Sequence, residues 1–128
     1  MQCLYDQLGK NKLRLLVETF YDIVERDPAA EELHLLHIRG HGLNHSRVEQ
    51  FNFLSGFFGG PQLYVRKFGH ANLKKIHEHI DIGPRLRQQW LDCMSQAMSR
   101  VDLPEKTAEE VMRHLTRMVE TIGHDRSE

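Results

Sequence analysis

Histidine is the residue that stands out when the sequence is searched for side chains able to do chemistry. The 128 residues include nine histidines, and imidazole binds metals and exchanges protons near neutral pH. His34 and His37 are three residues apart, and His41 and His45 are four apart. Two imidazoles at helical spacing can share one ion, but a structural zinc site needs four ligands and no further ligands follow nearby. A surface position is the favoured interpretation of this cluster.

His77 lies in a different setting. Leu73 and Ile76 precede it, and Ile82 follows before the segment that carries Trp90. A haem needs one neutral imidazole on its iron, a large apolar slot for the macrocycle, and cations or hydroxyls for its propionates. This neighbourhood contains such groups, yet a single histidine beside apolar residues is more often a packed or surface residue. From spacing alone, both interpretations of His77 stay open.

Motifs of several enzyme classes are absent. The sequence has no phosphate-binding glycine loop, no HExxH zinc helix, no nucleophile elbow and no basic stretch interleaved with aromatic residues. Seventeen basic and eighteen acidic residues give a formal net charge of -1, so no overall field attracts nucleic acid or a membrane surface. Cys3 and Cys93 form no CxxC pair, and we expect both to be reduced thiols.

The length and the first residues indicate a small cytoplasmic protein. A chain of 128 residues is long enough for one sizeable core, so we expect a single domain over 1–128. The N-terminal segment lacks the basic start and the long apolar stretch of a signal peptide. We expect a monomer or weak dimer without nucleic-acid or membrane partners.

Apolar residues recur at helical spacing, which predicts an all-α fold. The first helix is predicted from Lys12 to Glu25, with a stop at Asp27-Pro28, and a short one over 31–37. Ser46 and Glu49 fit a capping box at the start of the next helix.

The second half of the chain is less regular at first. Gly59-Gly60-Pro61 ends the preceding helix, residues 62–69 show no dependable period, and a short helix is expected over about 71–77. Pro84 and Pro104 then suit the first turn of the last two helices, because a proline has no amide to leave unpaired there.

Short motifs along the chain form one ordered pattern. They are Phe20-Tyr21-Asp22, Leu36-His37, Phe53-Leu54-Ser55-Gly56-Phe57-Phe58-Gly59-Gly60-Pro61-Gln62-Leu63-Tyr64, Gly69-His70, Leu73, His77, Ile82-Gly83 and Trp90-Leu91-Asp92-Cys93-Met94. In this order they resemble the truncated haemoglobins, and group II of that family most, over nearly the whole chain. The resemblance implies a globin-like two-over-two helical sandwich that holds haem b, iron protoporphyrin IX, between two helix pairs.

The resemblance also implies roles for four residues around the iron. His77 falls on the proximal ligand and is the expected metal ligand. Tyr21 falls on the distal tyrosine, whose hydroxyl donates a hydrogen bond to bound dioxygen. Trp90 falls on the group II tryptophan, whose indole N–H reaches the ligand while its ring packs on the haem. His37 falls where an imidazole pairs with the ligand or with Tyr21. For Tyr21 and Trp90, an ordinary core position is the alternative.

Other matched residues are expected to bind the rest of the haem. Phe53 and Ile82 are expected to contact the macrocycle, and Tyr64 to hydrogen-bond a propionate. Lys74 or Lys75 adds positive charge there, with a solvated surface position as the alternative.

Three features depart from the group II pattern. Ser46 and Gln50 fall at the two positions of the distal helix that face the ligand. Gln50 stands where this group often carries leucine, so it implies a second hydrogen-bond donor to the ligand or to iron-site water. Glu49 stands where a basic residue commonly meets a propionate, so Arg47 replaces that contact or the contact is missing. The loop over 38–44 looks about two residues longer than usual.

Reversible binding of dioxygen is the function that this pattern favours, with nitric oxide and carbon monoxide as further ligands. The alternative is an enzyme that oxidises nitric oxide with dioxygen or reduces peroxide, served by an unidentified reductase. A polar pocket that stabilises dioxygen also prepares it for such reactions. A third interpretation is a haem-free helical module whose histidines bind zinc or nothing.

Overall fold

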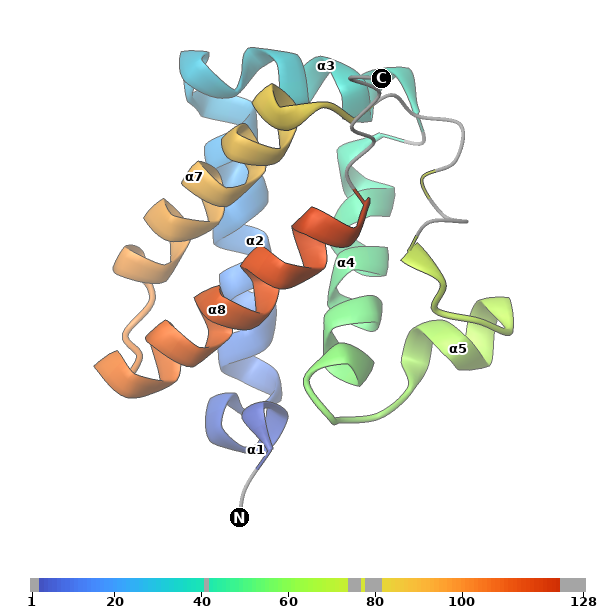
Figure 1. Ribbon diagram of the computed structural model, residues 1–128, viewed down its shortest axis with the longest axis vertical. Coiled ribbons are helices and arrows are strands. Elements are labelled where there is room, and N and C mark those ends of the chain that lie inside the picture. Colours follow the sequence, from blue (N-terminus) through green and yellow to red (C-terminus); the bar gives the residue numbers. More distant parts are fainter. Residues whose placement is uncertain (1–2, 41, 74–76, 78–81, 123–128) are drawn as a thin grey trace.

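The computed structural model describes residues 3–40, 42–73, 77 and 82–122 (Figure 1). The elements are α1 (Leu4–Leu8), α2 (Lys10–Arg26), the 3₁₀ turn η1 (Pro28–Ala30), α3 (Glu31–Arg39), α4 (Leu43–Phe57), α5 (Leu63–Phe68), α7 (Pro84–Arg100) and α8 (Glu105–Ile122). No strand occurs within these described ranges, and the all-α prediction is confirmed.

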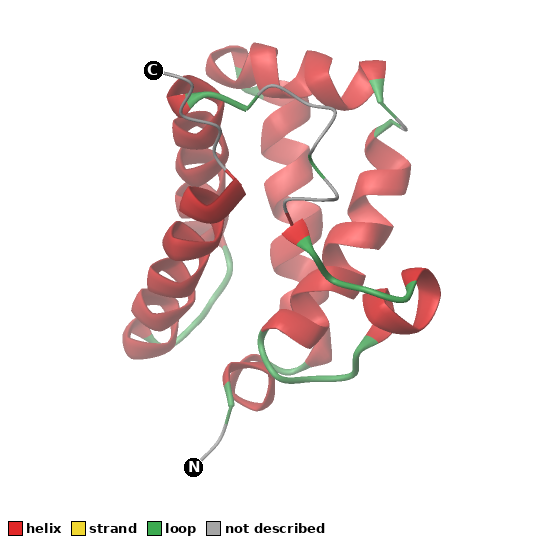
Figure 2. Cartoon of the chain, turned by 45° about the vertical axis from the view of Figure 1, so that its right-hand side comes forward, coloured by secondary structure: helices red, strands yellow, loops and turns green. Residues whose placement is uncertain are grey.

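Two helix pairs build the body of the molecule. α2 packs against α4 and against α7, and α7 packs against α8. Figure 1 shows α8 crossing α2 obliquely, while α4 and α5 lie together at the right. After the 45° turn of Figure 2, α7 and α8 stand to the left of the other helices. The pair α2–α4 set against the pair α7–α8 is the predicted two-over-two sandwich.

The core forms along α2 because its apolar residues repeat at spacings of three and four and therefore share one face. Leu13, Leu16, Val17 and Phe20 on this helix are all fully buried. Each such side chain contributes roughly 1.5–3 kcal/mol by leaving water. The fully buried residues that the other long helices add are Leu54 and Ser55 of α4, Met94 and Ala97 of α7, and Val111 and Leu115 of α8.

The end of α2 is as predicted, but the predicted start of α4 is wrong. α2 stops at Arg26, and the Asp27 carboxylate accepts a hydrogen bond from the Ala29 amide (3.0 Å) as Pro28 opens η1. α4 begins at Leu43, because Gly42 takes a positive φ of 89° that turns the chain there. Ser46 therefore lies inside the helix and makes no capping box: its hydroxyl donates to the Gly42 carbonyl (3.1 Å).

The loop before α4 is shorter than the sequence suggested. α3 continues to Arg39 and α4 starts at Leu43, so only residues 40–42 connect the two helices. The predicted loop over 38–44 is thus helical at both ends.

The Gly59-Gly60-Pro61 turn sets α5 against α4. Two hydrogen bonds to Ser55 hold the turn against the end of α4. The Gly60 amide donates to the Ser55 carbonyl (2.8 Å), and the Ser55 hydroxyl donates to the Pro61 carbonyl (2.8 Å). A Cβ on Gly60 would lie 2.4 Å from the Tyr5 ring, so only glycine lets α1 pack here. α1 and α5, of five and six residues, are too short for a period to reveal them.

The short helix expected over 71–77 is only partly described. Residues 74–76 lie outside the described ranges, and residues 71 and 72 are not helical. Pro84 occupies the first turn of α7 as predicted, whereas Pro104 directly precedes α8 and accepts the Ala108 amide at its carbonyl (2.9 Å).

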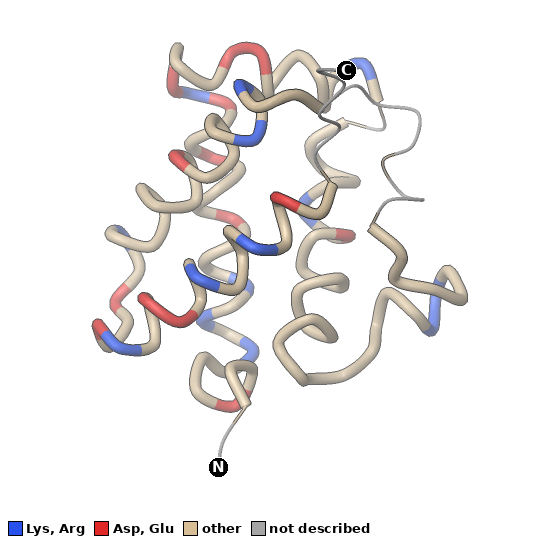
Figure 3. Tube along the Cα trace, in the orientation of Figure 1, with Lys and Arg blue, Asp and Glu red and all other residues tan. Residues whose placement is uncertain are grey.

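Charged residues of both signs are interspersed along α2 and α8 (Figure 3). In the part of the chain that the structure describes, no helix combines the length and the apolar character needed to cross a bilayer.

Candidate functional site

A cavity of about 630 Å³ opens between α2, α3, α4, α5, α7 and α8. Its volume lies in the range of about 300–1,000 Å³ that is usual for sites of cofactors and small molecules. Most of the lining is apolar, which suits a large flat hydrophobic ligand. The apolar side chains are Leu33, Leu36, Phe53, Phe68, Leu73, Ile82, Leu86, Met118, Val119 and Ile122.

His77 reaches this cavity from the segment between α5 and α7. Its ring Nδ1 lies 2.9 Å from the Leu73 carbonyl, which also accepts the His77 backbone amide (3.1 Å). Because a carbonyl only accepts, Nδ1 carries the ring proton, and in the neutral ring the lone pair is on Nε2. Metal-binding histidines are commonly oriented by such a bond to a backbone carbonyl.

His37 shows the same arrangement on α3. Its Nδ1 donates to the Leu33 carbonyl (2.8 Å), so its lone pair is also on Nε2. Burial lowers the pKa of His37 below the usual range, and the nearby His34 and His77 rings lower it further. The ring meets Tyr21 edge to face with centroids 5.4 Å apart. His37 is therefore a neutral imidazole that lines the same cavity as His77.

Tyr21 of α2 brings a buried hydroxyl to the cavity. Its side chain is buried, and the Ser46 hydroxyl of α4 interacts with it. The Ser46 hydroxyl itself donates to the Gly42 carbonyl. Burial raises the pKa of Tyr21 above its ordinary value, while the charge of Arg47 opposes that rise. The phenol is therefore a neutral donor.

Trp90 and Gln50 also line the cavity, and both side chains are half-buried. Trp90 comes from α7 and packs against Phe20 with ring centroids 5.1 Å apart. Gln50 comes from α4, one turn after Ser46. The predicted distal set of Tyr21, His37, Gln50 and Trp90 is thus brought together from four helices.

Three of the residues predicted to bind the rest of the haem lie in the lining: Tyr64, Phe53 and Ile82. Tyr64 meets Phe53 edge to face at 5.7 Å, and burial together with the charge of Glu49 raises the pKa of its hydroxyl. Lys74 and Lys75 lie outside the described residues.

Of the two alternatives for the basic contact, replacement by Arg47 finds no support in the described lining. Arg47 is not among the described lining residues, because its guanidinium is engaged with carboxylates of α2. Glu49 lines the cavity instead, and it is paired with Lys67 of α5 and with the Asn52 amide (3.0 Å).

Arg87 is a cavity residue that the sequence reasoning missed. Among the described residues of the lining, it alone carries a guanidinium or ammonium group. It is half-buried, and its Nη1 donates to the Ile82 carbonyl (3.4 Å). The signal was its position three residues before Trp90, which places both side chains on one face of α7.

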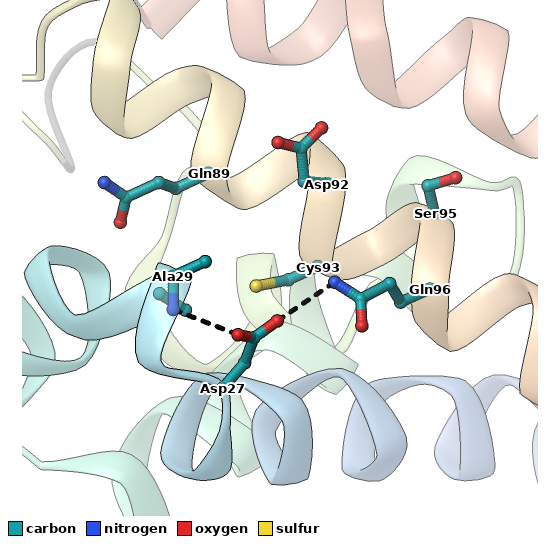
Figure 4. A pocket seen from close by; sticks show the side chains of 8 residues that line it. Asp27, Ala29, Gln89, Asp92, Cys93, Ser95 and Gln96 are labelled. Atoms are coloured by element: carbon teal, nitrogen blue, oxygen red, sulfur yellow. Dashed lines mark hydrogen bonds between the residues drawn. The ribbon is translucent and has the colours of Figure 1, made fainter.

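A second cavity, of about 360 Å³, lies between α7 and the end of α2 (Figure 4). Asp27 accepts hydrogen bonds there from the Ala29 amide and from Gln96 (3.2 Å). Burial raises the pKa of the Cys93 thiol to about 11, so this sulfur is neutral and a poor nucleophile near pH 7. Within the described ranges, no cluster of three His, Cys, Asp or Glu side chains is suited to a metal ion.

The large cavity fits a haem by its own chemistry. It offers an imidazole whose lone pair is fixed on Nε2, an extended apolar lining, and a guanidinium and a phenol for carboxylates. A single imidazole is enough for such a group, in contrast to a bare metal ion that needs several protein ligands.

Comparisons with known proteins agree with this fit. A family model described as bacterial-like globin matches residues 3–124. Group 2 truncated hemoglobin YjbI of Bacillus subtilis (strain 168) is 33% identical over 99 residues, which are 77% of this chain and 71% of that protein.

Solved structures give the same result. The group II 2-on-2 hemoglobin of the plant pathogen Agrobacterium tumefaciens superposes with a TM-score of 0.89 and 29% identity, covering 97% of this chain and 95% of that one. The truncated oxygen-avid haemoglobin of Bacillus subtilis gives 0.84 and 28%, covering 96% and 100%. The family implies a haem cofactor and small diatomic ligands. The chain therefore belongs to the bacterial-like globin family, among the group II truncated haemoglobins.

Proposed function

We propose that this chain binds haem b through Nε2 of His77 and reversibly holds a diatomic gas, dioxygen above all, beside the Tyr21 hydroxyl. One observation carries the proposal: a buried phenol donor reaches a cavity that is also lined by a histidine with its lone pair on Nε2. When bound, the haem supplies the iron to which the gas attaches. The side chains of the protein decide how firmly the gas is held.

Tyr21 is the main donor to the gas in this proposal. Dioxygen gains negative charge when it binds ferrous iron, and a hydrogen bond to a charged acceptor is stronger than one to a neutral acceptor. We propose that Ser46, whose hydroxyl interacts with Tyr21, competes with the gas for the phenol. A strong hold on dioxygen is in line with the relative from Bacillus subtilis that is described as oxygen-avid.

Trp90, His37 and Gln50 complete the polar wall of the pocket. His37 is neutral, so its Nε2 accepts hydrogen bonds and leaves donation to the gas to the other side chains. Trp90 has one indole N–H and Gln50 has two amide protons, and these two residues are the proposed secondary donors.

The haem propionates are proposed to lie near Arg87 and Tyr64. The Arg87 guanidinium matches the geometry of a carboxylate. At Tyr64, the negative charge of Glu49 would repel a propionate, but Lys67 balances that charge.

In an Arg87→Gln variant, haem should transfer to an excess of an apo-globin acceptor about threefold to tenfold faster. Arg85→Gln is the matched control, because Arg85 is 81% exposed and pairs with Glu32 outside the cavity. Equal transfer rates in both variants would exclude Arg87.

Visible spectra of the purified protein in its ferric, ferrous and dioxygen-exposed forms test the whole proposal. A Soret band, a ferrous form ligated by one histidine and a dioxygen spectrum that reverses on deoxygenation are expected. A colourless protein after growth with sufficient haem would refute haem binding. Catalytic consumption of nitric oxide in the presence of a reductant would replace reversible binding by the enzymatic alternative.

The proposal extends to the cellular setting. We propose a cytoplasmic protein that works with an unidentified reductase, because only ferrous iron binds dioxygen. A monomer or weak dimer is proposed because the exposed large apolar side chains are scattered over α2, α3, α4 and α5.

A further inference from the structure

Arg47 forms a cluster of charges that joins α4 to α2. Its Nη1 donates to the Glu18 carboxylate (2.5 Å) and to the Glu18 carbonyl (3.2 Å). Its Nη2 donates to the Asp22 and Glu25 carboxylates (2.9 and 2.5 Å). Glu18, Asp22 and Glu25 follow one another at spacings of four and three, so they form one face of α2. We call these four residues the Arg47 cluster.

The environment of the cluster makes it stronger than a typical surface ion pair. The Arg47 side chain is only 15% exposed, whereas its three partners are 40–46% exposed. An isolated surface pair contributes little, but a planar guanidinium shared by several acceptors fixes the geometry of all of them. The exposed carboxylates leave the cluster open to screening by salt.

Tyr21 lies within reach of this cluster. It stands on α2 between Glu18 and Asp22, and its ring centroid is 5.9 Å from the Arg47 guanidinium carbon. Ser46, the residue before Arg47, interacts with Tyr21 at its hydroxyl. Two adjacent residues of α4 therefore contact Tyr21: Ser46 at its hydroxyl and Arg47 at its ring.

We propose that Arg47 is a positioning residue, which holds α4 against α2 beside Tyr21 and thereby sets the strength of the hydrogen bond from Tyr21 to the bound gas. The proposal rests on the function proposed above, in which Tyr21 is the main donor. Arg47 makes no contact with the gas itself, since it is absent from the described lining of the cavity. Loosening the Arg47 cluster lets Tyr21 move away from the bound gas, and the release of the gas then becomes faster.

The test uses the haem-loaded protein and compares Arg47→Gln, Arg47→Lys and Arg85→Gln. For Arg47→Gln we expect dioxygen dissociation about threefold to tenfold faster, and a shifted or split C–O stretching band in the ferrous carbon monoxide form. Arg47→Lys keeps the charge and should restore part of the wild-type rate. Arg85→Gln, which breaks the exposed pair with Glu32, should match the wild type. A wild-type rate and band in Arg47→Gln would overturn the proposal.

Variants on α2 keep the test valid if Arg47→Gln does not fold. Asp22→Asn with Glu25→Gln removes two partners and leaves Arg47 bound to Glu18. This double variant should shift the C–O band in the same direction, and an unchanged band would count against the proposal. Between about 0.01 and 1 M salt, dioxygen release from the wild type should accelerate more than release from the double variant. An equal response to salt would likewise contradict it.

Tyr21→Phe separates this inference from the proposed function. If Tyr21→Phe moves the C–O band and Arg47→Gln does not, Tyr21 is the donor and the positioning role of Arg47 is refuted. If neither variant moves the band, the assignment of Tyr21 as donor fails as well.

Discussion

The two sides of the cavity are built in different ways. On the His77 side, one histidine is oriented by a carbonyl four residues earlier, so the arrangement is local in sequence. On the Tyr21 side, the phenol of α2, Ser46 of α4 and His37 of α3 depend on contacts between helices. In the proposed function, the orientation of the iron ligand is therefore set locally, whereas control of the gas depends on how the helices pack. Substitutions on the two sides should accordingly change different properties.

The largest expected effect is that of His77→Ala, which removes the imidazole and should abolish stable haem retention. The Soret absorbance per protein after purification measures this loss. His114→Ala is the matched control, because His114 makes the same ring bond to the Glu110 carbonyl (2.8 Å) but is not among the described lining residues. Retained haem with an unchanged ferrous spectrum would refute the assignment of His77. Retained haem with an altered spectrum would point to His37, whose lone pair is also on Nε2.

Tyr21→Phe should have the next largest effect and should leave haem retention intact. The ring keeps its packing against Phe20, at a centroid distance of 4.8 Å, while the donor is lost. A hydrogen bond to a charged acceptor contributes roughly 1.5–3 kcal/mol, so dioxygen should dissociate about tenfold to a hundredfold faster. Stopped-flow dissociation measures the rate. An unchanged rate would transfer the donor role to Trp90 or Gln50.

The same contrast explains how much the sequence could predict. The ordered motifs allowed the helical sandwich, His77 and the distal set to be predicted, since each belongs to a helix face or a short string. The engagement of Arg47 with α2 could not be predicted, because it depends on how α4 is rotated against α2. Ser46 was misjudged for a related reason: a serine three residues before a glutamate fits a capping box, but Gly42 starts the helix earlier. Arg87 was missed because its spacing from Trp90 shows that the two side chains share a face of α7, but not that this face borders a cavity.

Ser46→Ala should have a smaller effect, in the opposite direction. Ser46 is proposed to compete with the gas for the Tyr21 hydroxyl, and alanine removes this competing group while the helix around it is kept. A neutral hydrogen bond contributes about 0.5–1.5 kcal/mol, so dioxygen release should become roughly twofold to tenfold slower. Asn44→Ala on the exposed side of the same turn serves as the control. Faster release in Ser46→Ala would show that Ser46 holds Tyr21 in place for the gas and does not compete with it.

Gln50→Leu should have the smallest effect. It tests most directly how the hydrogen bonds to the gas are shared between Tyr21 and Gln50. Gln50 lines the cavity one turn after Ser46, but it is half-buried, so water competes for its amide more than for the buried Tyr21 hydroxyl. Leucine matches its size, and dioxygen release should quicken only about twofold to threefold. If the rates for Tyr21→Phe and Gln50→Leu multiply in the double variant, the two donors act independently. A double variant no faster than Tyr21→Phe alone would mean that Gln50 acts only through the position of Tyr21, and the tyrosine would then be the one direct donor from the α2–α4 pair.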